Sequence, residues 1–133
     1  GDDAIDESAA TVAKALKRFA GDSDVYLMHG NRDFLLGDSY ASQCGGRLVT
    51  EPYRLKAPTG DVLLLHGDSL CTDDVDYQQF RSQVRDPDWQ RQFLSMPIKE
   101  RVEFATAARQ QSKQQTAQKH QDIMDVNADA VDQ

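Results

Sequence analysis

The chain has little cysteine. Cys44 and Cys71 are the two cysteines among 133 residues. One disulfide could join them, but chains held together by disulfides are short and carry many more cysteines. A chain of this length can instead bury a hydrophobic core. We therefore expect two free thiols, as in a reducing compartment.

Long apolar runs and an excess of positive charge are also absent. No apolar run approaches the roughly 18 residues that a membrane-spanning helix needs. Fifteen Lys and Arg residues against twenty-two Asp and Glu residues give a net charge of −7. A broad nucleic-acid-binding face needs many cations against phosphate. We therefore expect no nucleic-acid partner, although a local basic patch remains possible.

The positions of apolar residues and helix breakers predict an α/β fold in the first half of the chain. A first helix should be capped by Asp2 or Asp3 and end at Gly21. A short second helix in "GDSYASQCGG" should be capped by Asp38. The first helix should turn four apolar residues toward the core, namely Ile5, Val12, Leu16 and Phe19.

Four strands are expected between and after these helices. The uniformly apolar runs 25–28 and 62–65 are typical of strands covered on both faces. Residues 47–49 and 53–55 are further strand candidates. From Tyr77 onward the composition favours helices, with breaks near "RDPDW" and at Pro97.

One short pattern occurs twice at the predicted strand ends. Residues 24–31 read "DVYLMHGN" and residues 61–68 read "DVLLLHGD". Ligands of open α/β sheets collect outside the carboxyl ends of strands, and His, Asn and Asp side chains can coordinate a divalent cation. Gly-Asn and Gly-Asp pairs are also common in turns. The pattern alone leaves both interpretations open.

The sequence around these pairs resembles a known family. "HGNRDFLLG", "LLLHGDSLCTDD" and "IMDVN" are similar to blocks of the calcineurin-like metallophosphoesterases, and in particular of the branch that acts on UDP-2,3-diacylglucosamine in lipid A biosynthesis. The resemblance runs from Gly1 to about Val131. It implies a sandwich of two β-sheets flanked by helices, with a helical insertion as a lid. Residues 1–76 would be the central α/β part, 77–122 the insertion, and 123–133 the return to the core.

The resemblance also implies an activity and a location. Such an enzyme hydrolyses the pyrophosphate of UDP-2,3-diacylglucosamine to UMP and 2,3-diacylglucosamine 1-phosphate, using two Mn²⁺ ions. It works as a peripheral protein on the cytoplasmic side of the bacterial inner membrane. Two metal ions can activate water and neutralise charge on phosphoryl oxygens.

Site residues follow from the matching positions. The resemblance implies that Asn31 and His66 are metal ligands and that Arg32, with its planar guanidinium, binds substrate phosphate. These three form the expected catalytic group, in which Asn31 also contacts substrate. Asp74 matches a substrate-contacting carboxylate. The remaining polar residues of these blocks have expected structural roles: His29 at the strand end, and Asp68 and Asp73 as turn caps or as groups that orient His66.

The segment "RQQSKQQTAQK" supplies further candidates. At about 100° per residue, Arg109, Ser112, Thr116 and Lys119 fall within an arc of about 80° on one helix face. They match substrate-contacting positions of the resembling family. Five apolar residues just upstream could line an acyl-chain site or pack against the domain, namely Phe93, Leu94, Ile98, Val102 and Phe104.

Three motifs of the family are not found in these 133 residues. They are an Asp-x-His, a Gly-Asp expected before Gly1, and a Gly-His-x-His expected after Gln133, and His120 is the one further histidine. We therefore expect an internal fragment of the enzyme that is inactive alone. Two alternatives stay open: another metallophosphoesterase, acting on nucleotides or phosphoproteins, or a non-catalytic helical interaction module in residues 81–133.

Overall fold

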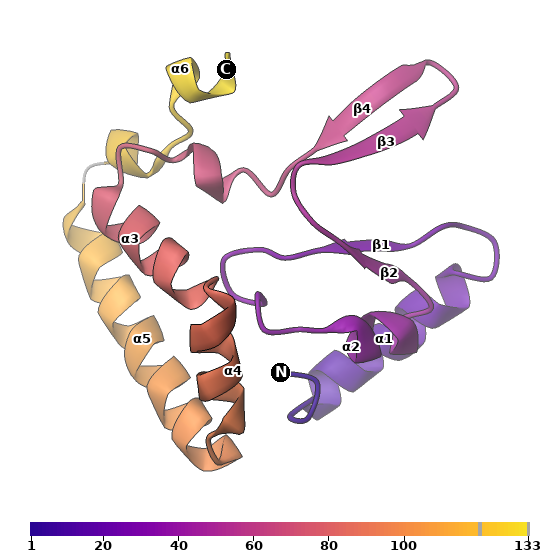
Figure 1. Cartoon of the computed structure of the whole chain (residues 1–133), viewed down its shortest axis with the longest axis horizontal. Helices are drawn as coiled ribbons and strands as arrows, with labels where there is room; N and C mark the ends of the chain where they lie inside the picture. The colour runs from indigo at the N-terminus through magenta and orange to yellow at the C-terminus, as the bar shows by residue number, and fades with distance from the viewer. Residues whose placement is uncertain (120, 133) are drawn as a thin grey trace. The chain divides into compact units, whose positions relative to one another are not determined.

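The computed structural model describes residues 1–119 and 121–132. The chain divides into two compact units, Gly1–His66 and Gly67–Gln133, and Figure 1 shows the strands in the first and most of the helical residues in the second. The α/β class predicted from the sequence is confirmed for the first unit.

The first unit contains a parallel strand pair and a hairpin. Its elements are α1 (Glu7–Phe19), β1 (Tyr26–Met28), α2 (Asp38–Gln43), β2 (Arg47–Val49), β3 (Tyr53–Ala57) and β4 (Gly60–Leu64). β1 pairs with β2 in parallel, with Leu27 opposite Leu48. Parallel strands need a crossover connection, and α2 lies in the segment that makes it. β3 and β4 pair antiparallel, with Leu55 opposite Val62.

The prediction of a second buried strand at residues 62–65 is wrong. Among the described residues β4 pairs with β3 alone, in a sheet separate from β1 and β2. Val62 is 41% and Leu63 is 55% exposed. An apolar run leads to burial only where another layer covers it, and β3 hydrogen-bonds to one edge of β4 without covering its faces.

The core of the first unit lies between α1 and α2. Ala13, Tyr40 and Cys44 are buried together, and the Tyr40 hydroxyl donates to the Ala9 carbonyl at 2.9 Å. The predicted apolar face of α1 is partly wrong, because Val12 and Phe19 are exposed. The small residues Ala9 and Ala13 let α1 approach α2 closely, and Val12 and Phe19 point roughly 80–100° away from that contact at 100° per residue.

Two helix caps differ from the prediction. Asp6 caps α1 by accepting from the Ala9 amide at 2.8 Å. Asp2 instead reaches α2, where it accepts from the amides of Gly37 at 2.7 Å and Tyr40 at 3.0 Å. The N-cap of α2 is Gly37, not Asp38. Because Gly37 has no side chain, the capping carboxylate comes from a distant part of the sequence.

The second unit is helical. Its elements are the 3₁₀ turn η1 (Asp68–Leu70), α3 (Val75–Val84), α4 (Pro87–Ser95), α5 (Ile98–Gln118), η2 (Gln121–Met124) and α6 (Ala128–Val131). The predicted breaks near residues 85–89 and at Pro97 are confirmed. Figure 1 shows α5 running back alongside α3 and α4. No helix in residues 1–119 and 121–132 is long and apolar enough to cross a membrane.

Aromatic packing joins α4 to α5. The rings of Trp89 and Phe93 stack at 4.8 Å between centroids, and Phe104 meets Phe93 edge to face at 5.1 Å. Phe93 is 8% exposed and Phe104 is 44% exposed. Of the apolar residues considered for an acyl-chain site, Phe93 therefore packs inside the unit. Leu94, Ile98 and Val102 are exposed.

The carboxylate of Asp2 should stabilise the first unit. Asp2→Ala removes the acceptor for two amides at the start of α2, and lost caps cost about 1–2 kcal/mol. We expect the free energy of unfolding, measured by urea denaturation, to fall by that amount. Asp22→Ala, which removes an exposed carboxylate after α1, should change it by less than about 0.5 kcal/mol. Equal losses in both variants would contradict the capping role.

Candidate active site

The two strand-end motifs meet in the first unit. Gly30 is buried just after β1, and His66 is exposed just after β4. A Cβ atom placed on Gly30 would lie 2.7 Å from Nε2 and 2.9 Å from Cδ2 of His66. The imidazole of His66 therefore rests against the backbone of Gly30. Residues that the sequence places in two separate repeats come together at one point.

The glycines of the two motifs serve different purposes. Gly30 leaves space for a ring, because any side chain would collide with His66. Gly67 has a φ of +91°, and this left-handed conformation favours glycine over other residues. The first glycine thus permits a close approach, and the second permits the turn that leads from His66 to Asp68.

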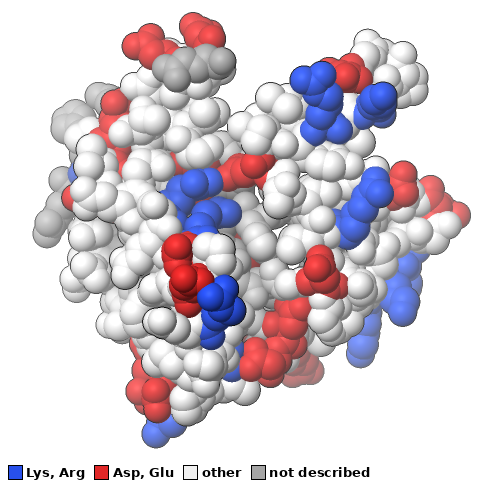
Figure 2. Space-filling view, viewed as in Figure 1, with Lys and Arg blue, Asp and Glu red and all other residues white. Residues whose placement is uncertain are grey.

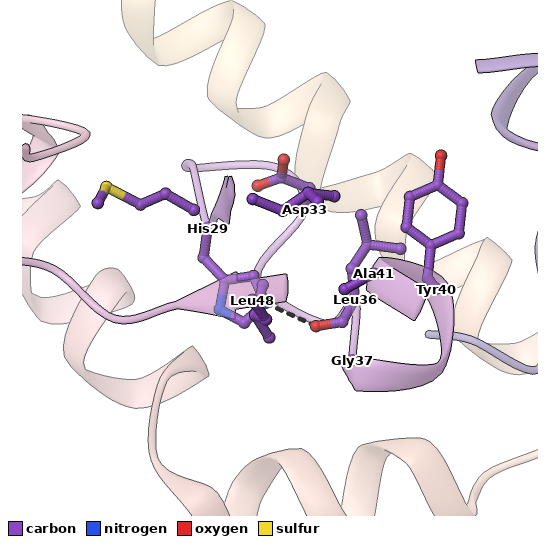
Figure 3. Close-up of a pocket in the computed structure, with 9 residues that line it drawn as sticks. His29, Asp33, Leu36, Gly37, Tyr40, Ala41 and Leu48 are labelled. Atoms are coloured by element: carbon purple, nitrogen blue, oxygen red, sulfur yellow. Dashed lines mark hydrogen bonds between the residues drawn. The ribbon is translucent and has the colours of Figure 1, made fainter. Parts of the chain in front are cut away.

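The loop after β1 is held by polar contacts within itself. His29 donates from Nε2 to the Leu36 carbonyl at 2.6 Å, as Figure 3 shows. Asp33 Oδ1 accepts from the Gly30 amide at 2.5 Å. His29 thus has the structural contact expected of it, and it also borders a small cavity with Asp33, Leu36 and Tyr40. That cavity has a volume of about 170 Å³, below the roughly 300 Å³ at which ligand pockets begin.

The predicted catalytic residues lie at the surface of this loop and beside it. Asn31 and Arg32 are exposed and follow Gly30 directly. The backbone amide of His66 donates to Glu51 Oε2 at 2.9 Å, which fixes the main chain that carries the imidazole. Sequence reasoning missed Asp33 and Glu51. A run of Gly, Asn and Asp directly after a strand is a detectable turn signal, whereas Glu51 lies on the connection between β2 and β3.

The donor types fit part of a metal site. An amide oxygen of Asn31 and an imidazole nitrogen of His66 are ligands that Mn²⁺ accepts, and the His66 ring lies against Gly30, the residue before Asn31. Within the described ranges, no three His, Cys, Asp or Glu side chains are grouped so that they could hold a metal ion. His120 lies outside the described residues. Asn31 and His66 are thus two candidate donors, and a complete metal site needs more ligands than these two.

In the second unit, two predicted substrate residues contact each other. Asp74 caps α3 by accepting from the Tyr77 amide at 3.1 Å, and the same carboxylate binds the Lys119 ammonium. Asp76 lies 3.6 Å from that ammonium. The hydrogen bond to Asp74 raises the pKa of Lys119 above its usual value. Lys119 is thus a fully charged group held at the start of α3.

Three of the four residues predicted to share one helix face lie on α5, and the fourth lies just beyond its end. Arg109, Ser112 and Thr116 are exposed on α5. Lys119 is the C-cap of that helix and has an extended backbone, with ψ of 144°. The prediction that Lys119 shares the helical face is therefore wrong. Leaving the helix is what allows its ammonium to reach Asp74.

Asp68 has a different role from the turn cap suggested by the sequence. Its buried carboxylate accepts from the Tyr77 hydroxyl at 2.5 Å and lies 3.2 Å from Arg81 Nε and 3.4 Å from Arg85 Nη2. Burial alone would raise its pKa, but the Tyr77 hydrogen bond and the two guanidinium groups hold the pKa of Asp68 below its usual value. Asp68 therefore anchors the segment after Gly67 to α3.

Charge over the rest of the molecule is mixed. Figure 2 shows basic and acidic side chains interspersed on the visible face. Arg54 lies 3.5 Å from Asp61, and Lys99 lies 4.0 Å from Glu103. Exposed pairs of this kind contribute about 0–1 kcal/mol each. The buried Asp68 cluster is therefore the electrostatic contact with the larger effect on stability.

The Asp68 cluster gives a pH-dependent prediction. Asp68→Asn keeps the size of the side chain but removes the charge between Arg81 and Arg85. We expect the free energy of unfolding at pH 7 to fall by about 2–3 kcal/mol, because both cations lose their buried partner. The pKa of Asp68 is lower in the folded state. Its contribution is therefore present above the unfolded pKa of about 3.9 and is lost as the pH falls through the folded pKa.

The measurement is urea unfolding of both proteins from pH 7 down to pH 3. The gap between them should narrow below about pH 4. Asp73→Asn is the matched control, because Asp73 is exposed and an asparagine oxygen can still accept from Asn127. A gap that stays constant in acid would show that the charge of Asp68 does not stabilise the fold.

The sequence of the chain is similar to those of several known proteins. No family model matches it. The UDP-2,3-diacylglucosamine hydrolase of Chromohalobacter salexigens is 43% identical over 133 residues, covering 99% of this chain and 54% of that protein. The Bordetella pertussis protein of the same name is 46% identical over 99% of this chain and 52% of its own length, and one from Stenotrophomonas maltophilia is 50% identical over 85% and 46%.

The chain spans about half the length of the curated relatives it matches. The similarity extends through both units, because the alignments to the first two relatives cover 99% of the chain. The resemblance predicted from the short motifs is thus confirmed, and the chain is a relative of the proteins named UDP-2,3-diacylglucosamine hydrolase.

Proposed function

We propose that the protein containing this chain hydrolyses the pyrophosphate bond of UDP-2,3-diacylglucosamine, giving UMP and 2,3-diacylglucosamine 1-phosphate for lipid A biosynthesis. The observation that carries the proposal is the 43–50% identity to proteins named for this substrate. The meeting of Gly30 and His66 supports it, because both predicted site segments contribute to one place in the fold.

The residues of the first unit have distinct proposed roles at the pyrophosphate. Asn31 and His66 are proposed to hold Mn²⁺, and two bound Mn²⁺ ions would supply Lewis-acid chemistry and a more acidic water. Arg32 is exposed, and its guanidinium can donate two parallel hydrogen bonds to phosphate oxygens. It has no lone pair available for a metal. Arg32 would therefore orient the substrate, leaving the ligand positions to Asn31 and His66.

The second unit is proposed to bind the glucosamine 1-phosphate half of the substrate. Lys119 offers a cation, and Arg109, Ser112 and Thr116 offer exposed donors on α5. Asp74 can accept hydrogen bonds from sugar hydroxyls while it neutralises Lys119. Because Asp74 already balances that charge, substrate phosphate would have to compete with a carboxylate for the ammonium.

The fold and location are part of the same proposal. We propose that β1 to β4 belong to the two-sheet sandwich of a calcineurin-like metallophosphoesterase and that the helical unit is its insertion. A lipid substrate would place the enzyme at the cytoplasmic side of the inner membrane as a peripheral protein. The alternative of a separate helical module has less support, because the similarity to relatives covers both units. A nucleotide or phosphoprotein phosphatase has less support because the relatives are named for the lipid nucleotide.

Hydrolysis and the role of Arg32 can be tested together in the full-length protein. With Mn²⁺ present, we expect release of UMP from UDP-2,3-diacylglucosamine. Arg32→Lys should lower kcat/KM by about tenfold or more, because a point charge cannot replace the two-pronged guanidinium. Manganese content, measured by elemental analysis, should stay unchanged. No UMP release by the unsubstituted protein would refute the function, and loss of manganese in the lysine variant would refute the role of Arg32.

The proposed substrate contacts of the second unit predict a change in KM. Arg109→Ala combined with Lys119→Ala removes two cations, and hydrogen bonds to charged groups contribute about 1.5–3 kcal/mol each. We expect KM for the lipid substrate to rise at least about tenfold while manganese content is unchanged. Lys99→Ala removes an exposed cation from the first turn of α5 and should leave KM unchanged. A double variant with wild-type KM would mean that these residues do not bind substrate.

A further inference from the structure

Asp33 connects both ends of the loop that follows β1. Its side-chain Oδ1 accepts from the Gly30 amide at 2.5 Å. Its backbone carbonyl accepts from the Leu36 amide at 2.9 Å. The Leu36 carbonyl in turn accepts from His29. One residue thus links the strand-end glycine to the far end of the loop.

We propose that Asp33 is a positioning residue for metal binding, acting through Gly30 on His66 and Asn31. This inference rests on the proposed function, because it assumes that Asn31 and His66 bind Mn²⁺. Asp33 would not itself touch the ion or the substrate. Its role would be to fix the backbone at Gly30, against which the His66 ring lies and from which Asn31 follows.

The reason such a support is needed lies in Gly30 itself. The close approach of His66 excludes a side chain at this position, and glycine has the greatest backbone freedom of all residues. The residue that makes room for the ring is therefore also the one least able to hold its own conformation. A hydrogen bond from its amide to the Asp33 side chain restricts that freedom.

Positioning and direct ligation make different demands on the Asp33 side chain. Oδ1 of Asp33 is engaged by the Gly30 amide, and it lies 3.3 Å from the place that a Gly30 Cβ would occupy. What Gly30 requires is an oxygen acceptor at that point. An asparagine supplies the same oxygen without the charge, whereas alanine supplies none. Metal ligation by Asp33 would instead depend on the negative charge.

The experiment titrates Mn²⁺ into the metal-free, full-length protein and measures free Mn²⁺ by electron paramagnetic resonance. Asp33→Ala should raise the Kd for Mn²⁺ by about tenfold or more, the range found for groups that orient metal ligands. Asp33→Asn should keep the Kd within about threefold of the unsubstituted protein, because the asparagine oxygen can still accept from the Gly30 amide. The imidazole signals of His66 in the metal-free protein should shift in the alanine variant and not in the asparagine variant.

Asp6→Ala is the matched control. Asp6 accepts from the amide three residues away, at 2.8 Å, but does so at the start of α1. Its loss should lower stability without changing the Kd or the His66 signals. Asp33→Glu provides a second test that does not depend on the alanine variant being folded, because it keeps the charge and moves the oxygen. It should raise the Kd as alanine does.

The outcomes distinguish this inference from the proposed function. A wild-type Kd in Asp33→Glu or Asp33→Ala would overturn the positioning role, and so would an asparagine variant as weak as the alanine variant. Absence of Mn²⁺ binding in the unsubstituted protein would overturn it as well. If the expected Kd changes occur but no UMP is released from UDP-2,3-diacylglucosamine, the positioning role stands and the proposed substrate is wrong.

Discussion

The contact between the His66 imidazole and Gly30 is the constraint on which the proposed site depends. A Cβ atom on Gly30 would lie within 2.9 Å of two ring atoms, so the ring can occupy its place only beside a glycine. Two carboxylates fix the backbones of the two residues in this contact. Glu51 accepts a hydrogen bond from the His66 amide, and Asp33 accepts one from the Gly30 amide. A strand end, a hairpin end and a loop thereby converge, although they lie far apart in the sequence.

Carboxylates organise the second unit in a comparable way. Within "GDSLCTDD", Asp68 is buried with Arg81 and Arg85, and Asp74 holds Lys119 at the start of α3.

The same block also contacts a segment near the end of the chain. Asp73 accepts from the Asn127 side chain at 2.9 Å, and the Asn127 backbone amide donates to the Leu70 carbonyl at 2.9 Å. "GDSLCTDD" and "IMDVN", two of the blocks that carry the resemblance, are therefore in direct contact. Each acidic residue of the first block has its own structural partner.

Local sequence patterns predicted where the helices and strands lie better than they predicted which residues cap or cover them. The strands at 25–28 and 47–49 and the break at Pro97 depend on neighbouring residues, and they occur within one or two residues of the expected places. The cap of α2 came from Asp2, and the exposure of Val62 depends on which layer covers β4. Neither the cap of α2 nor the exposure of β4 can be predicted from the residues adjacent to it in the sequence. For the candidate site, periodicity placed Lys119 on a helix that ends one residue earlier, because fraying and capping override an ideal 100° repeat.

The repeated His-Gly pair shows that identical residues can have different roles in the fold. The His29 ring donates to the Leu36 carbonyl, so one nitrogen is committed to the loop, whereas the His66 ring lies against Gly30. Gly30 is required by the space beside it, and Gly67 by its positive φ. The following residues diverge as well, since Asn31 is exposed while Asp68 is buried between arginines. The repeat therefore marks two strand ends whose glycines meet different geometric needs, and the chemistry of each histidine is set by its partners.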